Sequence, residues 1–222
     1  MAIVKRLLIA WTARSIAPCR QHFAALTGTD RVWVQGHTET EVAAWITRNL
    51  DELAAYDTVS LCPDDAVLSQ QTFDVITDTC LRNPEDAASG WANVDFTLPL
   101  ATVMVEPVPE QLTEDWYTLL TVPEVVAHDG PIRATWSGMA CHTMTPALWA
   151  EHPIRPHHPQ GGGAASDHAL ALSLQAEGRG IIVDPRAALM HLKVDHHKVD
   201  VGEAWKRLDL HTKRVTWERA EA

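Results

Sequence analysis

The sequence is poor in cysteine, and its few cysteines are scattered. No Cys-x-x-Cys motif occurs among the four, which disfavours a disulfide scaffold and a zinc site built on paired cysteines. We therefore expect four reduced thiols in a cytoplasmic protein. The cysteines are Cys19, Cys62, Cys80 and Cys141.

Long hydrophobic runs are also missing. No segment approaches the length of a membrane span. The apolar start of the chain resembles a signal peptide, but its apolar run is short and Arg14 follows closely. We interpret it as the first buried strand of a globular fold.

Positive charge is scarce as well, and the formal net charge is −11. This balance disfavours a dedicated nucleic-acid binder, which normally carries a basic face, although it permits a local basic patch. It suits a protein that binds an anionic substrate through a metal ion.

Aromatic residues are mostly Trp, with nine Trp against three Phe and two Tyr. Most of these belong in a core, but a Trp ring in a cleft can also stack on a sugar or a base.

The apolar pattern in the first half alternates between strands and helices. The length of 222 residues, with 46% hydrophobic and 21% charged residues, fits one globular domain with a short tail. Alternating strands and helices predict an α/β fold, a Rossmann-like, mainly parallel sheet with helices on both faces. The expected strands are 6–12, 31–35 and 57–62, and the expected helices are 18–27, 39–54 and 70–82.

The second half has a different pattern. Three prolines indicate an extended linking region over 99–113, and His, Pro and Gly indicate a flexible loop over 151–165. The remaining expected elements are a strand over 131–145 with a central glycine, a helix from Ser166 to about Glu177, a strand and its continuation over 181–192, and a peripheral helix from about Lys198.

Polar residues follow each of the first three strands, and in parallel sheets ligands bind at the carboxyl ends of the strands. Asp64 and Asp65 come directly after the third strand. Adjacent carboxylates repel each other, and a divalent cation that also holds a diphosphate balances them well. The alternative is that they cap the following helix.

Two further candidates lie in the second half. Asp167 begins a helix after three glycines, so it is either a helix cap or a general base beneath a mobile loop. His191 ends an apolar segment, so it is either a core residue or a metal ligand. His157, His158, His196 and His197 suggest a zinc alternative, but their spacings match no common zinc pattern.

In this order along the chain, the segments resemble the GT-A glycosyltransferases, in particular the family-two-like group. The resemblance covers roughly residues 6–193. Its segments are Ile9–Arg14 for the first strand and nucleotide-binding turn, Tyr56–Val67 for the strand leading to an Asp-x-Asp-type motif, Trp136–Ala140 beneath the acceptor site, Gly163–Leu170 for the catalytic carboxylate, and Gly180–Leu192 for the strand ending in a metal-binding histidine.

Two segments depart from the family pattern. The third strand ends in Pro63-Asp64-Asp65 rather than Asp-x-Asp, which leaves open which carboxylate touches the metal. The second strand ends in Gln35-Gly36-His37, where many members place an acidic residue against the base, so the identity of the base is also open.

The resemblance implies a role for each matching residue. Asp65 and His191 would bind Mn²⁺ or Mg²⁺, and Asp167 would act as the base of an inverting transfer to an acceptor hydroxyl. The donor would be a UDP- or GDP-sugar. The remaining implied contacts are Thr12, Arg14, Asp64 and Asp65 to the donor, and Trp136, Gly138 and Gly163 on the acceptor side.

Several points stay open from the sequence. The acceptor is a protein, a glycan, a small molecule or a modified DNA base. The alternatives in function are a nucleotidyltransferase, disfavoured because the turn after the first strand has no glycine, and a non-catalytic nucleotide-sugar binder. The small size suggests a minimal phage or bacterial enzyme. The expected division is a domain over 1–198, with a donor half over 1–98 and an acceptor half over 99–198, and a charged helical tail over 199–222.

Overall fold

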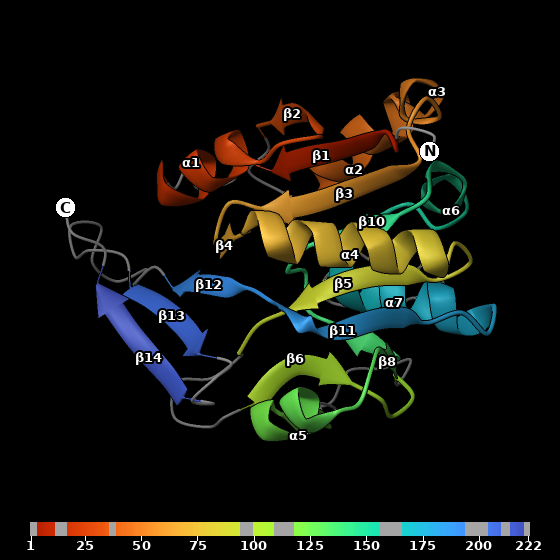
Figure 1. Cartoon of the computed structure of the whole chain (residues 1–222). Coiled ribbons are helices and arrows are strands. Elements are labelled where there is room, and N and C mark those ends of the chain that lie inside the picture. Colours follow the sequence, from red (N-terminus) through yellow and green to blue (C-terminus); the bar gives the residue numbers. More distant parts are fainter. Residues whose placement is uncertain are drawn as a thin grey trace.

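Figure 1 shows the fold of the chain in a computed structural model. The structure describes residues 4–11, 17–35, 39–93, 100–108, 118–155, 166–193, 204–209 and 214–219.

A seven-stranded sheet forms the centre of the molecule. In spatial order its strands are β2 (Asp30–Val34), β1 (Arg6–Trp11), β3 (Thr58–Pro63), β10 (His142–Met144), β5 (Ala87–Trp91), β11 (Ile181–Ala188) and β8 (Ile132–Ala134). β1 is parallel to β2 and β3, and β5 is parallel to β11. β10 is antiparallel to both β3 and β5, so those two strands point the same way, and only β10 and β8 run against the rest. The predicted α/β fold with a mainly parallel sheet is confirmed.

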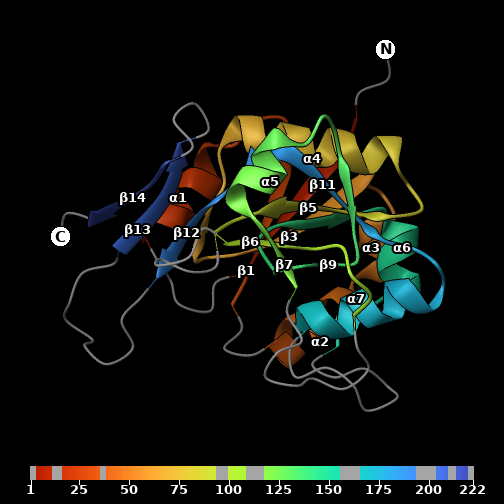
Figure 2. The ribbon, with the colours of Figure 1, turned by 90° about the horizontal axis from the view of Figure 1, so that it is seen from below.

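Helices cover both faces of this sheet, as predicted (Figures 1 and 2). Successive residues of a strand point to opposite faces. Accordingly Leu8 belongs to one core, with Phe23 and Phe73, while its neighbours Leu7 and Ile9 belong to the other. The helices are α1 (Ala17–Ala25) and α4 (Gln70–Arg82) on the first core, and α2 (Glu39–Arg48), α3 (Leu50–Leu53), α5 (Val122–Ala127), α6 (Pro146–Glu151) and α7 (Ser166–Ala176) on the second.

Two smaller sheets adjoin the central one. The first is antiparallel and has the order β7 (Leu119–Thr121), β6 (Leu100–Met104), β9 (Trp136–Ser137). The second is also antiparallel and has the order β14 (Arg214–Arg219), β13 (Ala204–Asp209), β12 (Met190–Lys193), β4 (Ala66–Val67).

Two predicted elements are divided in the structure. The helix expected over 39–54 breaks between α2 and α3 at Asn49, whose side-chain amide donates to the carbonyl of Trp45 at 2.7 Å. A side chain that bonds a backbone carbonyl in this way competes with the regular helix. The strand expected over 131–145 is three short strands, because the chain leaves the central sheet after β8, pairs β9 with β6, and returns as β10.

One expectation of secondary structure is incomplete and another is wrong. The region 99–113, expected as an extended linking region, contains the strand β6, which is extended but pairs on both sides. The tail expected to be a helix contains β13 and β14, which pair with each other, and β13 also pairs with β12. The high charge of the tail indicated exposure, but charge alone does not distinguish the spacing of a helix from that of a strand. The residues Val215, Thr216 and Trp217 have a high propensity for strands. The division at residue 198 stays a prediction.

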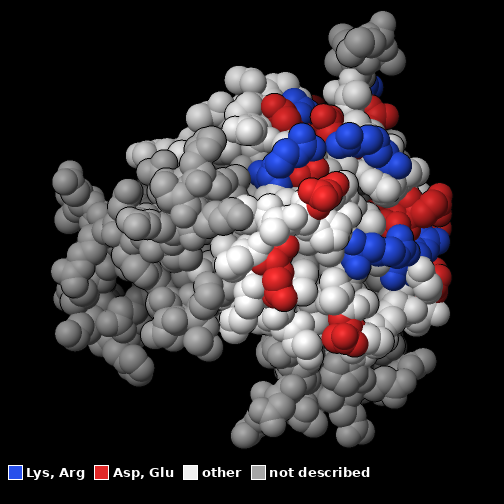
Figure 3. All heavy atoms as spheres, turned by 60° about the horizontal axis from the view of Figure 1, so that its bottom comes forward, with Lys and Arg blue, Asp and Glu red and all other residues white. Residues whose placement is uncertain are grey.

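The surface carries charge of both signs. Figure 3 shows Lys and Arg beside Asp and Glu on one face, where the described residues form no uniform basic patch. The ion pairs of the described residues include Arg6–Asp74 and Arg133–Asp86, both at 2.5 Å. Within the described part of the chain, no helix is long and apolar enough to cross a membrane.

Candidate active site

The carboxyl ends of β1 and β3 bring Asp64 and Asp65 to one edge of the central sheet. Trp11 pairs with Pro63, and the backbone N–H of Asp64 donates to the carbonyl of Trp11 at 2.9 Å. The chain therefore leaves both strands at the same point, as expected for a ligand site in such a sheet. Asp64 is fully buried, whereas the Asp65 side chain is 14% exposed.

His191 reaches the same point from the other half of the chain. β12 runs antiparallel to β4, with His191 opposite Ala66 and Met190 opposite Val67. This register puts the imidazole Nε2 of His191 3.3 Å from Oδ2 of Asp65, across 126 residues of sequence. The structure thus brings together the two residues that the sequence predicts as metal ligands.

The distance between these two atoms suits a shared metal ion. Ligand atoms about 2.1 Å from an ion and at a right angle to each other lie about 3.0 Å apart. Both side chains are partly exposed, at 26% for His191 and 14% for Asp65, so an ion has access. The carboxylate oxygen suits Mn²⁺ and Mg²⁺ alike, whereas the imidazole nitrogen favours a transition ion such as Mn²⁺ over Mg²⁺.

A bulge in β11 directs the chain toward this position. The pairing of β11 with β5 shifts register between Val183 and Ala188. The indole N–H of Trp91 donates to the carbonyl of Pro185 at 3.0 Å, and the N–H of Leu189 donates to the carbonyl of Trp91 at 2.7 Å. Bulges bend a strand and redirect its side chains. Here the bulge lets the chain leave the central sheet and continue as β12 beside β4.

Asp184 and Arg186 hold the bulge together. The Arg186 side chain donates to both carboxylate oxygens of Asp184, at 2.9 and 2.7 Å, and its backbone N–H donates at 2.9 Å. Burial raises the pKa of Asp184, but these hydrogen bonds outweigh burial and the net pKa is lowered. Asp184 is therefore ionised at neutral pH although it is buried.

Buried thiols lie under the Asp64–Asp65 turn. Cys62 precedes the turn, and its thiol lies 3.2 Å from the carbonyl of Ala140. Burial raises the pKa of Cys62 well above its usual value, and the neighbouring Cys141 thiol raises it further. All four cysteines are free thiols, as predicted, and all four are buried. These thiols therefore pack as small apolar groups.

Asp167 lies in the first turn of α7. One of its carboxylate oxygens accepts a hydrogen bond from the backbone N–H of His168 at 2.7 Å. The C-terminal end of α7 lies beside α6, and β11 follows after a short connection, so α7 runs back along β11 (Figures 1 and 2). The start of α7 therefore points toward the end of the sheet that carries Asp65. The contact with His168 is a helix-terminal bond, and the base role stays a prediction.

The acceptor-side residues occupy a packed region. Trp136 is 4% exposed and belongs to a small core with Ala171 and Leu172 of α7. A side chain at Gly138 would meet Thr102 at 3.2 Å, so glycine permits close packing there. Their predicted contact with an acceptor remains untested. Thr12, Arg14 and Gly163, with His157, His158, His196 and His197, lie outside the described residues.

The sequence offered no sign of a second cluster of potential ligands. Glu151, His152 and Glu177 meet at the opposite end of the sheet. His152 and Glu177 are 25 positions apart, which hides the cluster in the sequence, and the helix that carries Glu151 was not predicted.

Comparison with known proteins identifies the fold. No known family matches the sequence, and no curated protein matches it. Among solved structures, A197 from STIV matches with a TM-score of 0.60 at 10% identity, over 98% of this chain and 96% of that one. GalNAc-T7, solved with UDP, GalNAc and Mn²⁺, matches with a TM-score of 0.52 at 7% identity, over 85% of this chain and 44% of that one. At these identities the likeness concerns the fold alone, and the chain has a GT-A-like fold.

Proposed function

We propose that the protein is a metal-dependent glycosyltransferase that moves a sugar from a nucleotide-sugar donor to an acceptor hydroxyl. The observation that carries this proposal is the contact of Asp65 with His191 at the carboxyl edge of a GT-A-like sheet. Two potential metal ligands from distant segments meet at the edge where such sheets bind ligands. The solved structure of GalNAc-T7 with UDP, GalNAc and Mn²⁺ shows that a related fold accommodates these molecules.

Asp65 and His191 are proposed to hold Mn²⁺ or Mg²⁺. A bound ion of this kind neutralises negative charge on the departing diphosphate of the donor. Asp64 adds a second carboxylate beside the first, and we propose that it contacts the ribose or the sugar. Thr12 and Arg14 are proposed to bind the nucleotide, which we take to be a UDP- or GDP-sugar.

Asp167 is proposed to act as the base on the acceptor side, with Trp136, Gly138 and Gly163 around the acceptor. It would accept the proton of the acceptor hydroxyl while the hydroxyl oxygen bonds to the anomeric carbon and the bond from that carbon to the diphosphate breaks. This in-line displacement inverts the anomeric carbon. A carboxylate is a weak base for an alcohol, so proton transfer must accompany bond formation and positioning must supply much of the acceleration. We propose the family-two-like group as the nearest relatives in mechanism.

The first experiment separates metal binding from the rest of the site. A set of UDP- and GDP-sugars is screened for protection against thermal unfolding, with and without Mn²⁺, because a specific donor stabilises the folded chain by mass action. Protection that requires Mn²⁺ is expected for the native chain, and its loss is expected for Asp65→Asn and His191→Ala. The exposed residues Asp129 and His22 provide matched controls, Asp129→Asn and His22→Ala, which should behave like the native chain. Equal Mn²⁺-dependent protection in all four variants would contradict the proposal that Asp65 and His191 bind the metal ion.

The second experiment measures sugar transfer and nucleotide release. With a protecting donor, Asp167→Asn is expected to keep donor binding and to lose sugar transfer and nucleotide release. Normal turnover by this variant would show that Asp167 is not the base. Metal-dependent binding without any transfer or hydrolysis by the native chain would instead favour a non-catalytic binder, and synthesis of a nucleotide sugar from a sugar phosphate would favour a nucleotidyltransferase.

A further inference from the structure

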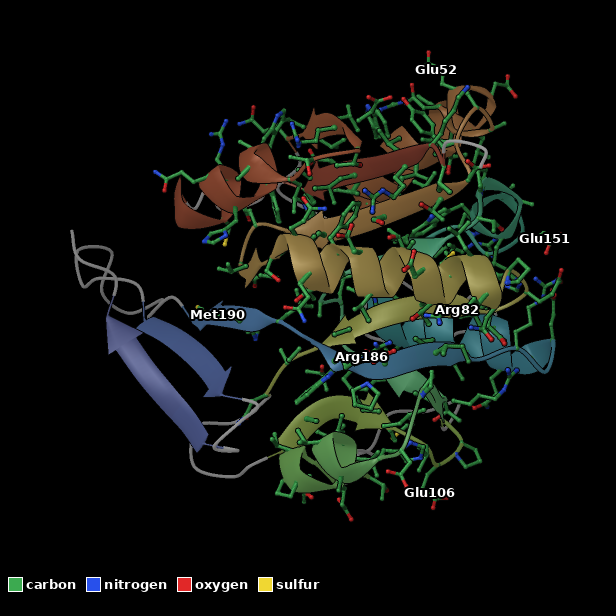
Figure 4. All side chains as sticks on the ribbon, viewed as in Figure 1. Glu52, Arg82, Glu106, Glu151, Arg186 and Met190 are labelled. Carbon is green, nitrogen blue, oxygen red and sulfur yellow. The ribbon has the colours of Figure 1, made fainter. Side chains whose placement is uncertain are left out.

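A second group of potential metal ligands lies where α6 and α7 end. Glu151 is the last residue of α6, His152 caps that helix, and Glu177 follows the last residue of α7. One ligand atom from each of the three lies within 4.8 Å of the other two. This cluster is far from Asp65 and His191. Figure 4 shows Glu151 and Met190, the neighbour of His191, at opposite ends of the molecule, and Figure 1 places α6 and β4 in the same way.

The main evidence for a metal site is the environment of the His152 side chain. Its side chain is 1% exposed, and its Nδ1 atom lies 2.9 Å from the hydroxyl of Ser173. Its Nε2 atom makes no hydrogen bond among the described residues and lies 3.4 Å from a carboxylate oxygen of Glu177. A buried polar atom normally has a partner. The imidazole therefore presents an unsatisfied nitrogen to the two carboxylates.

The orientation of this imidazole suits a metal ligand. A histidine binds a metal ion through a ring nitrogen that carries no proton. When Nδ1–H donates to Ser173, the lone pair of Nε2 faces the carboxylates. Metal-bound histidines commonly use their second nitrogen in this way.

The surrounding charge favours a cation. Arg179 contacts Glu151 at 2.8 Å and Glu177 at 3.3 Å, and Glu85 lies 3.9 Å from the same guanidinium. Three carboxylates against one guanidinium leave two negative charges beside the imidazole. The carboxyl ends of two helices also meet here, and their exposed carbonyl groups add partial negative charge.

We propose that Glu151, His152 and Glu177 form a second metal site that takes Zn²⁺ or a similar divalent transition ion. One nitrogen and two carboxylate oxygens suit such an ion better than Mg²⁺ or Ca²⁺, which prefer oxygen ligands alone. Arg179 shares these carboxylates, so the ion competes with its guanidinium and displaces it. The bound ion links the end of α6 to the end of α7, the helix that begins with Asp167, and its role is structural because the candidate active site lies at the other end of the sheet.

The test counts zinc ions on the full-length chain by equilibrium dialysis and elemental analysis. The variant combines Glu151→Gln and Glu177→Gln, because both side chains are 53% exposed and their replacement is compatible with folding. It should bind one Zn²⁺ fewer than the native chain, or bind it at least tenfold more weakly. The same loss should appear in a chain that also carries Asp65→Asn and His191→Ala, which separates this site from the proposed active-site metal and from other histidines.

Two controls address charge and competition. Glu85→Gln removes the same charge beside Arg179 but no proposed ligand, so the zinc count and affinity should stay as in the native chain. Arg179→Met removes the competing guanidinium and should tighten binding at least tenfold. An equal zinc count and affinity in the native chain and the doubly substituted variant would overturn the proposal, and so would unchanged binding after Arg179→Met.

Discussion

Asp167, Asp65 and His191 each also have an ordinary structural use, which the structure shows directly. Asp167 accepts a hydrogen bond in the first turn of its own helix. His191 and Asp65 lie at a distance that fits an ion pair as well as a shared metal ion. The sequence singled out these residues because carboxylates and histidines at the ends of strands are suited to metal and base chemistry. The family resemblance paired Asp65 with His191, but the residues alone could not, since their contact depends on the register between β4 and β12.

His142 is a buried histidine that the sequence gave no reason to single out. It lies in the centre of the sheet, is fully buried, and neither ring nitrogen has a hydrogen-bond partner among the described residues. Burial lowers its pKa to about 4. The folded chain therefore holds this imidazole neutral in a pH range where the unfolded chain protonates it.

We predict that this difference destabilises the fold as the pH falls. Between the usual histidine pKa of about 6.5 and the folded value of about 4, the unfolded chain binds one more proton at this position. The free energy of unfolding should decrease across this range by up to about 3 kcal/mol, since each pKa unit corresponds to about 1.4 kcal/mol. Urea unfolding at pH 7.0, 5.5 and 4.5 measures the decrease.

A variant isolates the contribution of His142. His142→Met keeps a flexible apolar side chain in the sheet and removes the titrating group. Its free energy of unfolding should fall less steeply with pH than that of the native chain. His152 titrates in the same direction and remains in both chains, so it supplies the residual slope. Parallel pH profiles for the two chains would contradict the role given to His142.

At the scale of elements, strands and helices with a clear apolar pattern were predicted well. β1 and β3 are continuous buried runs, and α4 has the bounds expected from its spacing. The missed or misread elements are short or depend on partners. β5 contains Gly90 and has no strong strand signal, and the glycine permits close packing because an added Cβ would lie 2.4 Å from the end of the Leu189 side chain. β4 has two residues and exists through its pairing with β12.

The bulge in β11 gives a prediction at this scale. Arg186→Met removes the side-chain hydrogen bonds to Asp184 and leaves a buried carboxylate with fewer partners. The loss of stability at pH 7 should be about 1–2 kcal/mol, at the lower end for hydrogen bonds to a charged group because the Arg186 side chain is 64% exposed. Chemical unfolding of both chains measures it.

The pH dependence of this loss identifies its cause. The pKa of Asp184 is lowered in the fold, so its contribution is fully present above the unfolded value of about 3.9 and disappears as the pH falls through the folded value. The native chain and Arg186→Met should therefore converge in stability at low pH. A difference that stays constant down to pH 3 would attribute the loss to packing of the arginine side chain instead.

At the scale of the whole molecule, the two halves expected from the sequence share one sheet. The donor half supplies β1, β2, β3 and β5, and the acceptor half supplies β8, β10 and β11. In the sheet, β10 pairs with β3 and β5, and β11 also pairs with β5, so strands of the two halves alternate. This interleaving has a direct consequence for the site, because Asp65 and His191 come from different halves. A parallel order of strands was predictable from alternating elements, but the insertion of β10 between β3 and β5 depends on contacts between distant segments.

The boundary at residue 198 can be tested with a chain that ends there. All seven strands of the central sheet lie before this boundary, and both large cores are formed by residues before it. The shortened chain should therefore still unfold in a single cooperative transition, as measured by circular dichroism during thermal unfolding. The loss of β13 is nevertheless expected to affect the active site, because β13 pairs with β12 and sets Lys206 opposite His191.

Removing β13 leaves β12 held on one side by β4 alone, through two residue pairs. The position of His191 beside Asp65 should then be less well fixed. Because a metal site depends on ligands held in place, Mn²⁺-dependent protection by a nucleotide sugar should weaken about tenfold or more in apparent affinity. Retained affinity would show that β4 suffices to place His191. Loss of cooperative unfolding would instead make residues 199–222 part of the folded domain and move its boundary to the end of the chain.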